Sequence, residues 1–298
     1  MLAIAQSQHR FHFLQWVPAS NGPLINGYGT IEDPDFQIHK PSSIVQLIRR
    51  INSEVPIEHP VFTFSLDIEN LLITEAAGAD EVDPEEFLEW HGQLMQDDDF
   101  RMRYRSYHYS LAVTPRRFLS LHMPRGIIDS FSAAMQELQC ELRVLGLGIF
   151  SAEECARLCP RAGEHSSYLI WRMGHSGNDQ ILHCEDGELR AYLHLYRHGS
   201  KIELTEVFGD VALGEKIRAE LTQYFTGDLQ KFSSASHVFA YQCREKDVDL
   251  KRLLEAAIPN VSLLNPLKQV TLETPSRINY LRSSCLAETG LAFRGVDV

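Results

Sequence analysis

The pattern of strand-like and helical runs in this chain occurs twice, once in each half. Each half opens with three short strand-like runs separated by polar or proline- and glycine-rich turns, which is typical of a meander. A helix, a strand and a further helix follow in both halves. The predicted meander strands are residues 2–6, 11–16 and 24–31 in the first half and 168–173, 180–185 and 189–198 in the second. Such a repeat predicts duplicated mixed α/β units.

Capping signals predict where several helices begin. Ser42 or Ser43 is expected to cap the first helix, and residues 83–86 combine a capping acid, a proline and first-turn acids. Residues 151–154 form a capping box for a helix that crosses between the two halves. The tail over residues 283–295 is expected to be a final helix.

Turn signals predict how some strands pair. Residues 61–73 are expected to form two paired strands with a turn near residues 67–70. Asp186-Gly187 is the dipeptide of a tight two-residue hairpin. Further strands are predicted at residues 104–114, 118–122 and 142–150.

The composition argues against several classes of partner. The 298 residues carry a formal net charge of −12, whereas nucleic acids and anionic membranes bind concentrated positive charge. No apolar run approaches the length of about 20 residues that spans a bilayer, and the amino terminus lacks the pattern of a signal peptide. Six cysteines without framework spacing fit reduced thiols. We therefore expect a cytoplasmic protein without nucleic acid or direct membrane insertion.

The turn after the first strand of each meander has an unusual composition. The first turn reads Ala-Gln-Ser-Gln-His over residues 5–9, and the second reads Arg-Met-Gly-His-Ser-Gly over residues 172–177. In turns that hold phosphate, glycine lets the backbone approach the oxygens and an acid positions Mg²⁺. Neither turn carries such an acid. The sequence therefore predicts no metal site and no metal-dependent phosphate chemistry there.

Three strings in the second half form an ordered set. Residues 287–295 are a run of small residues that ends in Gly-Leu-Ala-x-Arg, residues 263–267 are a strand followed by Asn-Pro, and residues 184–189 contain the Asp-Gly hairpin. Together with the order of elements, this set resembles the actin-like PilM family of type IV pilus assembly proteins. That family is related to the cell-division protein FtsA and to the cytoplasmic domain of the secretion protein GspL.

The resemblance implies an actin-like (ribonuclease H-like) α/β fold with two duplicated lobes, each centred on a mixed five-stranded sheet. Residues 1–150 would form the first lobe, with an inserted subdomain at about 60–122. Residues 151–298 would form the second lobe, whose C-terminal helix returns to the first.

The chain departs from the family at three nucleotide-binding positions. Residues 3–7 lack the Asp-x-Gly of the first turn, Arg172 replaces the acid of the second turn, and residues 239–243 replace the Gly-Gly that contacts adenosine. ATP hydrolysis and a cofactor are therefore not expected, while binding of ATP with Mg²⁺ stays an alternative. The vestigial cleft residues that could still contact a nucleotide or another anion are Gln6, Ser7, Arg172, Gly174, Ser176 and Gly177. A further hypothesis is that Arg172 pairs with an acid such as Glu288 in place of the lost metal site.

A possible zinc site has a simpler structural interpretation. Cys155 and Cys159 lie four residues apart on a predicted helix, and His165 or Cys184 could complete a ligand set. No second close cysteine pair is present, so two small buried residues are the favoured interpretation.

Two other patterns also favour structural roles. Residues 101–109 mix arginines with aromatic residues, which fits an amphipathic strand better than a nucleic-acid platform. Ser65 and Asp67 could belong to a hydrolase triad, but no nucleophile elbow occurs in the chain.

The resemblance implies a non-catalytic scaffold or assembly factor of a type IV pilus or type II secretion-like inner-membrane complex. In the family, a groove in the first lobe receives a short amino-terminal peptide of a membrane partner, and a homodimer is a further option. One alternative is an active actin-like ATPase or nucleotide-binding protein whose acids lie elsewhere, at Asp67 or Asp179. Another is an unrelated protein-binding module on the same fold.

Overall fold

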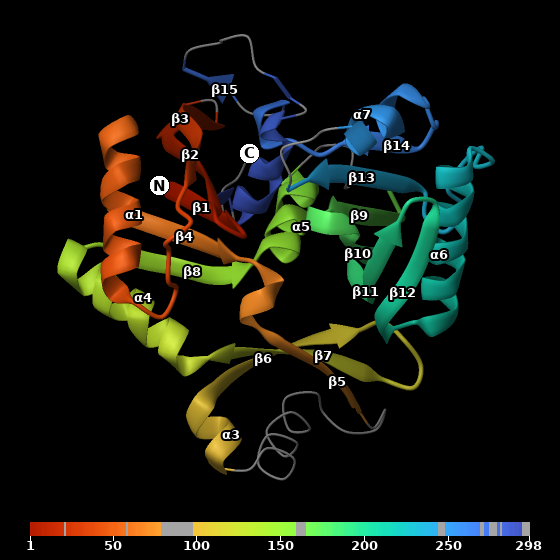
Figure 1. The fold of residues 1–298 in the computed structure, drawn as a ribbon, viewed down its shortest axis with the longest axis horizontal. Coiled ribbons are helices and arrows are strands. Elements are labelled where there is room, and N and C mark those ends of the chain that lie inside the picture. The colour runs from red at the N-terminus through yellow and green to blue at the C-terminus, as the bar shows by residue number, and fades with distance from the viewer. Residues whose placement is uncertain are drawn as a thin grey trace.

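The structure, a computed structural model, contains two six-stranded mixed sheets side by side (Figure 1). A three-stranded sheet lies below both of them in this view. No helix in the described part of the chain is both long enough and apolar enough to cross a membrane. The structure describes residues 1–20, 22–57, 59–78, 98–158, 165–243, 248–268, 271–273, 279–280 and 282–293.

The first sheet has the strand order β15-β3-β2-β1-β4-β8. β1, β2 and β3 form the predicted antiparallel meander, and β4 and β8 continue the sheet parallel to β1. β15 pairs with the outer edge of β3 and adds a strand to the five that were predicted. The strands are β1 (Leu2–Ser7), β2 (Arg10–Ala19), β3 (Gly22–Glu32), β4 (Val61–Leu66), β8 (Glu141–Leu147) and β15 (Thr271–Leu272).

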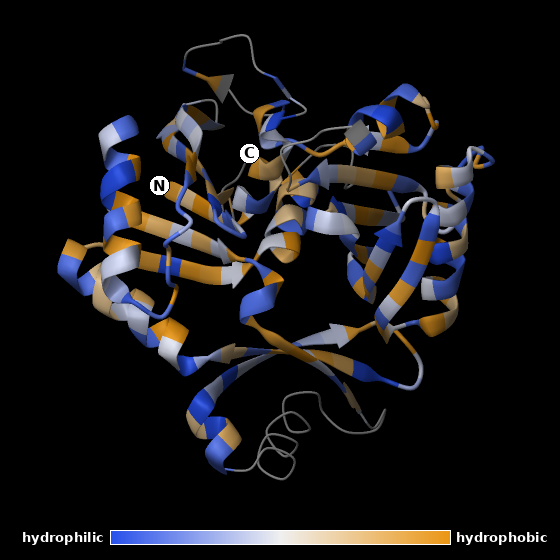
Figure 2. Ribbon diagram, in the orientation of Figure 1, coloured by the Kyte–Doolittle hydropathy of each residue, from blue (hydrophilic) through white to orange (hydrophobic). Residues whose placement is uncertain are grey.

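Alternating side chains of the first sheet supply two separate cores. Leu2 and Ile4 of β1 pack with α1 and α4, whereas Ala3 belongs to a cluster with η4, in which Phe293 stacks on Trp16 at 6.1 Å. In Figure 2 the helices α1 and α6 alternate blue and orange, as expected for helices with one face on a sheet. The covering helices are α1 (Pro41–Glu54), α4 (Arg125–Leu138) and the 3₁₀ helix η4 (Arg282–Phe293).

The second sheet repeats this arrangement in the order β12-β11-β10-β9-β13-β14. β9 to β12 are antiparallel, and β13 runs parallel to β9 and to β14. One core includes Trp171, Leu221 and Leu253 and lies under α6 (Val211–Thr226) and α7 (Val248–Glu255). The strands are β9 (Ser167–Met173), β10 (Asn178–Glu185), β11 (Glu188–His198), β12 (Lys201–Gly209), β13 (His237–Gln242) and β14 (Val261–Leu263).

Helix α5 (Gly148–Leu158) lies where the three sheets meet (Figure 1). Ile149, Ala152 and Ala156 of this helix share a buried cluster with residues of all three sheets and of η4. The third sheet has the order β5-β7-β6. Its elements and neighbouring short helices are β5 (Leu72–Ala77), β6 (Tyr104–Leu111), β7 (Arg117–Pro124), η1 (Ile68–Asn70) and α3 (Asp98–Arg103); η2 (His175–Gly177) and η3 (Pro266–Lys268) belong to the second half.

The hairpin predicted at Asp186-Gly187 is present between β10 and β11. The two residues have φ angles of 51° and 82°, the left-handed pair that a type I′ turn requires. The final helix is also present, as a 3₁₀ helix over the described residues 282–293. The helix predicted to start at residues 83–86 lies outside the described residues.

The predicted start of the first helix was wrong. α1 begins at Pro41, with Lys40 at the cap position and no side-chain hydrogen bond to the helix end. Proline at the first helical position has the helical φ already and lacks only an N–H that would be unpaired there. Ser42 and Ser43 therefore lie inside the helix.

Two further predictions were wrong for reasons of packing. α5 begins at Gly148, so Ser151 lies inside it and donates its hydroxyl to the carbonyl oxygen of Leu147 (3.1 Å). The two strands predicted within residues 61–73 exist but do not pair: β4 pairs with β1 and β8, whereas β5 pairs with β7. β4 is buried on both sides, as a central parallel strand must be.

Gly290 brings the backbone of η4 against α5. A Cβ at this position would lie 2.1 Å from the carbonyl oxygen of Ser151 and 2.6 Å from the amide nitrogen of Cys155. We expect Gly290→Ala to lower the free energy of unfolding by about 1–3 kcal/mol, because the two backbones must separate. Urea denaturation followed by circular dichroism measures this change.

Gly126→Ala is the matched control on α4. A Cβ at Gly126 would have His39 Nδ1 as its nearest neighbour, at 3.9 Å, and alanine favours a helix interior over glycine by about 1 kcal/mol. We expect this variant to be at least as stable as the parent. Unchanged stability of the Gly290→Ala variant would contradict the close packing of η4 on α5.

Candidate functional site

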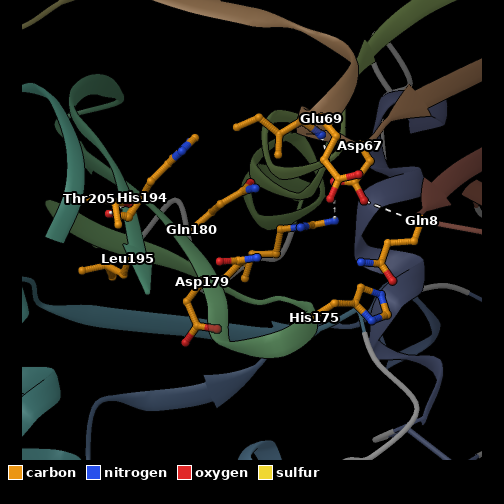
Figure 3. Close-up of a pocket in the computed structure, with 12 residues that line it drawn as sticks. Gln8, Asp67, Glu69, His175, Asp179, Gln180, His194, Leu195 and Thr205 are labelled. Carbon is orange, nitrogen blue, oxygen red and sulfur yellow. Dashed lines mark hydrogen bonds and ion pairs between the residues drawn. The ribbon is translucent and has the colours of Figure 1, made fainter. Parts of the chain in front are cut away.

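A cavity of about 150 Å³ lies between the two halves of the molecule (Figure 3). Asp67 and Glu69, which follow β4, line one side, and Arg172, Gln180 and His194 of the second sheet line the other. The two turns singled out in the sequence meet at this place, because each follows the first strand of its meander. The cavity is therefore the candidate functional site.

The two turns are joined directly by hydrogen bonds of Ser7. Its hydroxyl donates to the carbonyl oxygen of Cys243 (2.9 Å), so it accepts from Nε2 of His175, also at 2.9 Å. Ser7 is fully buried. The first half of the molecule is thus bonded to the second where a ligand would otherwise separate the turns.

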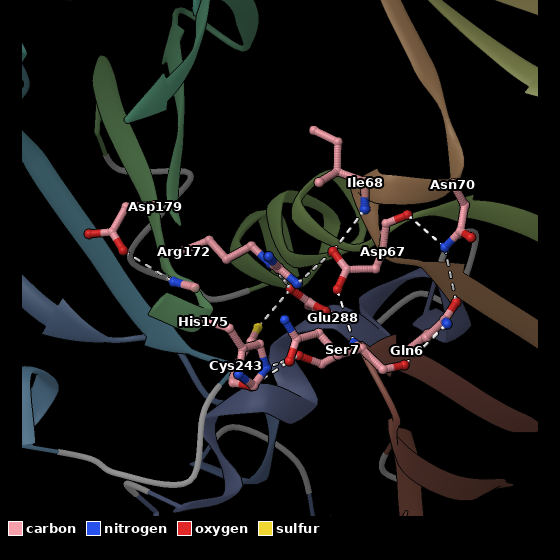
Figure 4. Close-up of polar contacts among 12 residues, drawn as sticks. Gln6, Ser7, Asp67, Ile68, Asn70, Arg172, His175, Asp179, Cys243 and Glu288 are labelled. Atoms are coloured by element: carbon pink, nitrogen blue, oxygen red, sulfur yellow. Dashed lines mark hydrogen bonds and ion pairs between the residues drawn. The ribbon is translucent and has the colours of Figure 1, made fainter. Parts of the chain in front are cut away.

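Arg172 lies between two carboxylates from different parts of the chain (Figure 4). Its Nε donates to Glu288 Oε1 at 2.5 Å, and its Nη2 lies 3.4 Å from Asp67 Oδ1. The three side chains are 5%, 0% and 7% exposed for Arg172, Glu288 and Asp67. The pairing of Arg172 with Glu288 that the sequence suggested is present, and Asp67 adds a second partner.

Further donors converge on the same oxygen of Glu288. The hydroxyl of Tyr241 donates to Oε1 at 2.9 Å and the thiol of Cys243 at 3.0 Å. Burial raises the pKa of both groups well above their usual values, with the charge of Glu288 adding to the shift, so both stay protonated donors. A side chain at Gly148 could not fit, because a Cβ there would lie 2.7 Å from the Glu288 carboxyl group.

Strand pairing places five polar residues on one rung of the second sheet. Tyr241 lies opposite Arg172, Arg172 opposite Gln180, Gln180 opposite His194, and His194 opposite Glu206. Directly paired residues point to the same face. Nδ1 of His194 lies 3.1 Å from Glu206, and burial together with the charge of Arg172 lowers the pKa of His194 to about 4, so the ring is neutral at pH 7.

Asp179 holds the second turn in shape. It accepts hydrogen bonds from the backbone N–H of Gly174 and from the indole N–H of Trp171, both at 3.2 Å, and lies 3.7 Å from Arg197 Nε. Asp67 likewise accepts from the backbone N–H groups of Gln8 and Ile68. Both acids line the cavity, but their oxygens bond to protein donors. Within the described residues no group of three histidines, cysteines or acids could hold a metal ion.

The six cleft residues predicted from the sequence have different positions and contacts in the structure. Arg172 lines the cavity and Ser7 bonds across it, while Gly174 donates to Asp179. Gln6 bonds to Asn70 and to the carbonyl oxygen of Gln8. Gly177 packs against β11, where a Cβ would lie 2.2 Å from a carbonyl oxygen, and the neighbouring Ser176 is exposed.

Gln180 and His194 were missed by the sequence analysis. Each lies within a predicted strand, and a polar residue in a strand usually faces solvent. The strand register, which the sequence does not give by itself, brings Gln180 beside Arg172 and His194 beside Gln180.

The other sequence patterns have structural roles in the described residues. Residues 104–111 form the predicted strand, and Tyr109 stacks on Phe150 at 5.0 Å. Ser65 hydrogen-bonds to Ser151 at 2.5 Å, so a hydrolase triad is not assembled around it. Cys155 is buried, as the simpler interpretation expected, and the predicted partner at residue 159 lies outside the described residues.

The arrangement of the two sheets and their helices defines the fold class: the chain has the actin-like fold of two duplicated α/β lobes, as the sequence predicted. The solved PilM-PilN type IV pilus biogenesis complex is similar over 100% of this chain and 98% of that chain, with a TM-score of 0.65 and 12% identity. At this identity the likeness shows the fold. No protein-family model matches the sequence, and no curated protein matches it.

Two further solved structures are more distant. The cytoplasmic domain of EpsL, an inner-membrane component of the type II secretion system of Vibrio cholerae, is 11% identical over 98% of this chain and 94% of that chain, with a TM-score of 0.44. A protein of unknown function with an actin-like ATPase fold, from Bacteroides thetaiotaomicron, is 11% identical over 89% of this chain and 90% of that chain, with a TM-score of 0.43.

Removing the charge of Arg172 should destabilise the protein strongly. Arg172→Met leaves the carboxylates of Glu288 and Asp67 buried without their cation, and we expect a loss of about 3–5 kcal/mol in the free energy of unfolding. Arg172→Met combined with Glu288→Gln should lose less than the sum of the two single changes, because both members of the pair are then neutral. Urea denaturation of the four proteins measures the coupling. Strictly additive losses in the free energy of unfolding would contradict the coupling between Arg172 and Glu288.

Buried histidines should make the stability fall at mildly acidic pH. Burial, with Arg10 as the next cause, lowers the pKa of His12 to about 3, and that of His194 is about 4. Below about pH 6.5 the unfolded chain therefore binds more protons than the folded chain, so the free energy of unfolding falls as the pH falls. We expect a slope that approaches about 1.4 kcal/mol per pH unit for each such histidine between about pH 7 and pH 5.

His12→Asn tests this pH dependence. In this variant the slope of the free energy of unfolding against pH should be smaller by the contribution of one histidine, about 1.4 kcal/mol per pH unit at most. Urea denaturation at a series of pH values measures the slope. His9→Asn is the matched control, because His9 is exposed in the turn after β1. An unchanged slope in the His12→Asn variant would contradict the assignment.

Proposed function

We propose that this protein is a non-catalytic scaffold that works in the cytoplasm in a type IV pilus or type II secretion-like inner-membrane complex. The observation that carries the proposal is the buried ion group of Arg172, Glu288 and Asp67 between the two turns. In an actin-like ATPase that position serves phosphate and Mg²⁺. Here it holds a cation and two anions of the protein itself.

The size and bonding of the cleft support the absence of catalysis. Pockets that bury a drug-sized ligand, which is about the size of a nucleotide, commonly have volumes of about 300–1,000 Å³. The cavity between the lobes has about 150 Å³, and the Ser7–His175 bond ties the turns together. Asp67 and Asp179, the acids on which an active ATPase would depend, accept hydrogen bonds from the backbone and from Trp171.

A protein partner is the other half of the proposal. The solved structure with the same fold at a TM-score of 0.65 is a complex of PilM with PilN. We propose that the first lobe of this chain similarly receives a short peptide of an inner-membrane protein. Peptide recognition on a rigid scaffold needs no moving cleft.

A nucleotide assay separates the scaffold from an active ATPase. We expect millimolar ATP with Mg²⁺ to leave the melting temperature unchanged, and phosphate release to equal that of the Asp67→Asn and Asp179→Asn variants. Thermal-shift fluorimetry and a phosphate-release assay provide the two measurements. Stabilisation by ATP with Mg²⁺, with turnover lost in either variant, would establish the ATPase alternative instead.

A capture experiment tests the partner. The tagged chain, incubated with detergent-solubilised native membranes, should enrich an inner-membrane component of a pilus or secretion complex over a tag-only control. A synthetic peptide of that component's cytoplasmic amino terminus should compete with the capture. Recovery of a defined partner outside these complexes would favour an unrelated binding module on the same fold.

A further inference from the structure

Gln180 is a largely buried residue whose amide faces the cavity and has no hydrogen-bond partner in the described part of the chain. The residue is 5% exposed and lines the cavity between the lobes. Its rung neighbours are bonded: Arg172 and Tyr241 to Glu288, and His194 to Glu206. In Figure 3 the Gln180 amide extends toward the side of the cavity where Asp67 lies. Nε2 of His194, opposite Gln180 on the same rung, is buried without a hydrogen-bond partner in the described part of the chain. An unpaired buried nitrogen costs free energy, which points to a partner that enters the cavity.

The hydrogen-bonding groups around Gln180 require a ligand that both donates and accepts. The amide offers a carbonyl oxygen and an NH₂ group. Arg172 uses Nε and Nη2 for its carboxylate partners, and its Nη1 has no partner among the described residues, so it can donate. Asp67 adds an acceptor on the opposite side. A hydroxyl group donates and accepts at once without adding charge, whereas an ammonium group cannot accept.

The charge and the volume of the cavity further restrict the kinds of ligand that could bind there. Three carboxylates line the cavity, from Asp67, Glu69 and Asp179, against the single guanidinium of Arg172. An added anion would meet unfavourable charge, and Glu288 already neutralises Arg172 from behind. A cavity of this volume, about 150 Å³, is comparable to cavities that hold one six-membered ring.

We propose that the cavity between the lobes binds a small uncharged polyhydroxy compound, of the size of a polyol or a single sugar ring, through Gln180, Arg172 and Asp67. This site is independent of the scaffold function, because the peptide partner would bind the first lobe. Failure of one proposal therefore leaves the other standing. The ligand would add bonds between the two halves of the molecule.

Calorimetric titration of the full chain with glycerol, myo-inositol and glucose tests the proposal, with inorganic phosphate and ATP with Mg²⁺ as the charged comparison. We expect at least one neutral compound to bind with a dissociation constant of about 1 mM or below. Neither charged compound should bind. Gln180→Leu should weaken the binding by about tenfold or more.

Stability distinguishes a ligand-binding role of Gln180 from a structural one. Leucine in place of an unpartnered buried amide should leave the melting temperature of the unliganded protein unchanged or raise it, while reducing the shift caused by the neutral compound. Gln223→Leu, on the exposed face of α6, is the matched control and should bind as the parent does. The proposal is overturned if none of the three neutral compounds binds, if phosphate or ATP binds, or if Gln180→Leu binds as tightly as the parent.

Discussion

The burial of Arg172 between two carboxylates is the interaction on which the rest of the structure depends. Arg172 is the next-to-last residue of β9, Asp67 follows β4, and Glu288 lies on η4, so the ion group joins both sheets and the C-terminal helix. Burying any of these charges alone would cost several kcal/mol. Their mutual pairing therefore defines where the two lobes must lie relative to each other. Gly148 and Gly290 let η4 approach closely enough to bring Glu288 into place.

The direct bonding between the two turns follows from the same chemistry. In a phosphate-binding cleft, a ligand with its metal ion bridges the two turns. Here Ser7 bonds to His175 directly, and Arg172 supplies the positive charge that a metal would supply. Groups of the protein therefore bridge the two lobes directly. Direct bridging suits a scaffold whose binding surface must stay in one shape, which is why we connect these bonds with the proposed partner binding.

Local sequence patterns were sufficient to predict much of the fold, but they did not predict the register of the strands. Apolar periodicity and the Asp186-Gly187 turn predicted both meanders. Glu185 lies opposite Glu188 at the start of the hairpin. If the pairing continued from there without interruption, Gln180 would lie opposite Leu193. A bulge between His183 and Cys184 moves it opposite His194. A shift of one residue decides which face each side chain occupies, so the polar rung could not be predicted without knowing the bulge.

An arginine at position 172, rather than an acid, is what allows the ion group to balance its own charges. An acid at position 172 would leave Glu288 and Asp67 without a cation of the chain, and three buried carboxylates would then need a bound metal. Arginine at this position removes that need and fills much of the cleft. What remains beside it is a small space with a neutral histidine and an amide. The arginine that balances the buried acids thus also borders the small space in which we propose a neutral ligand.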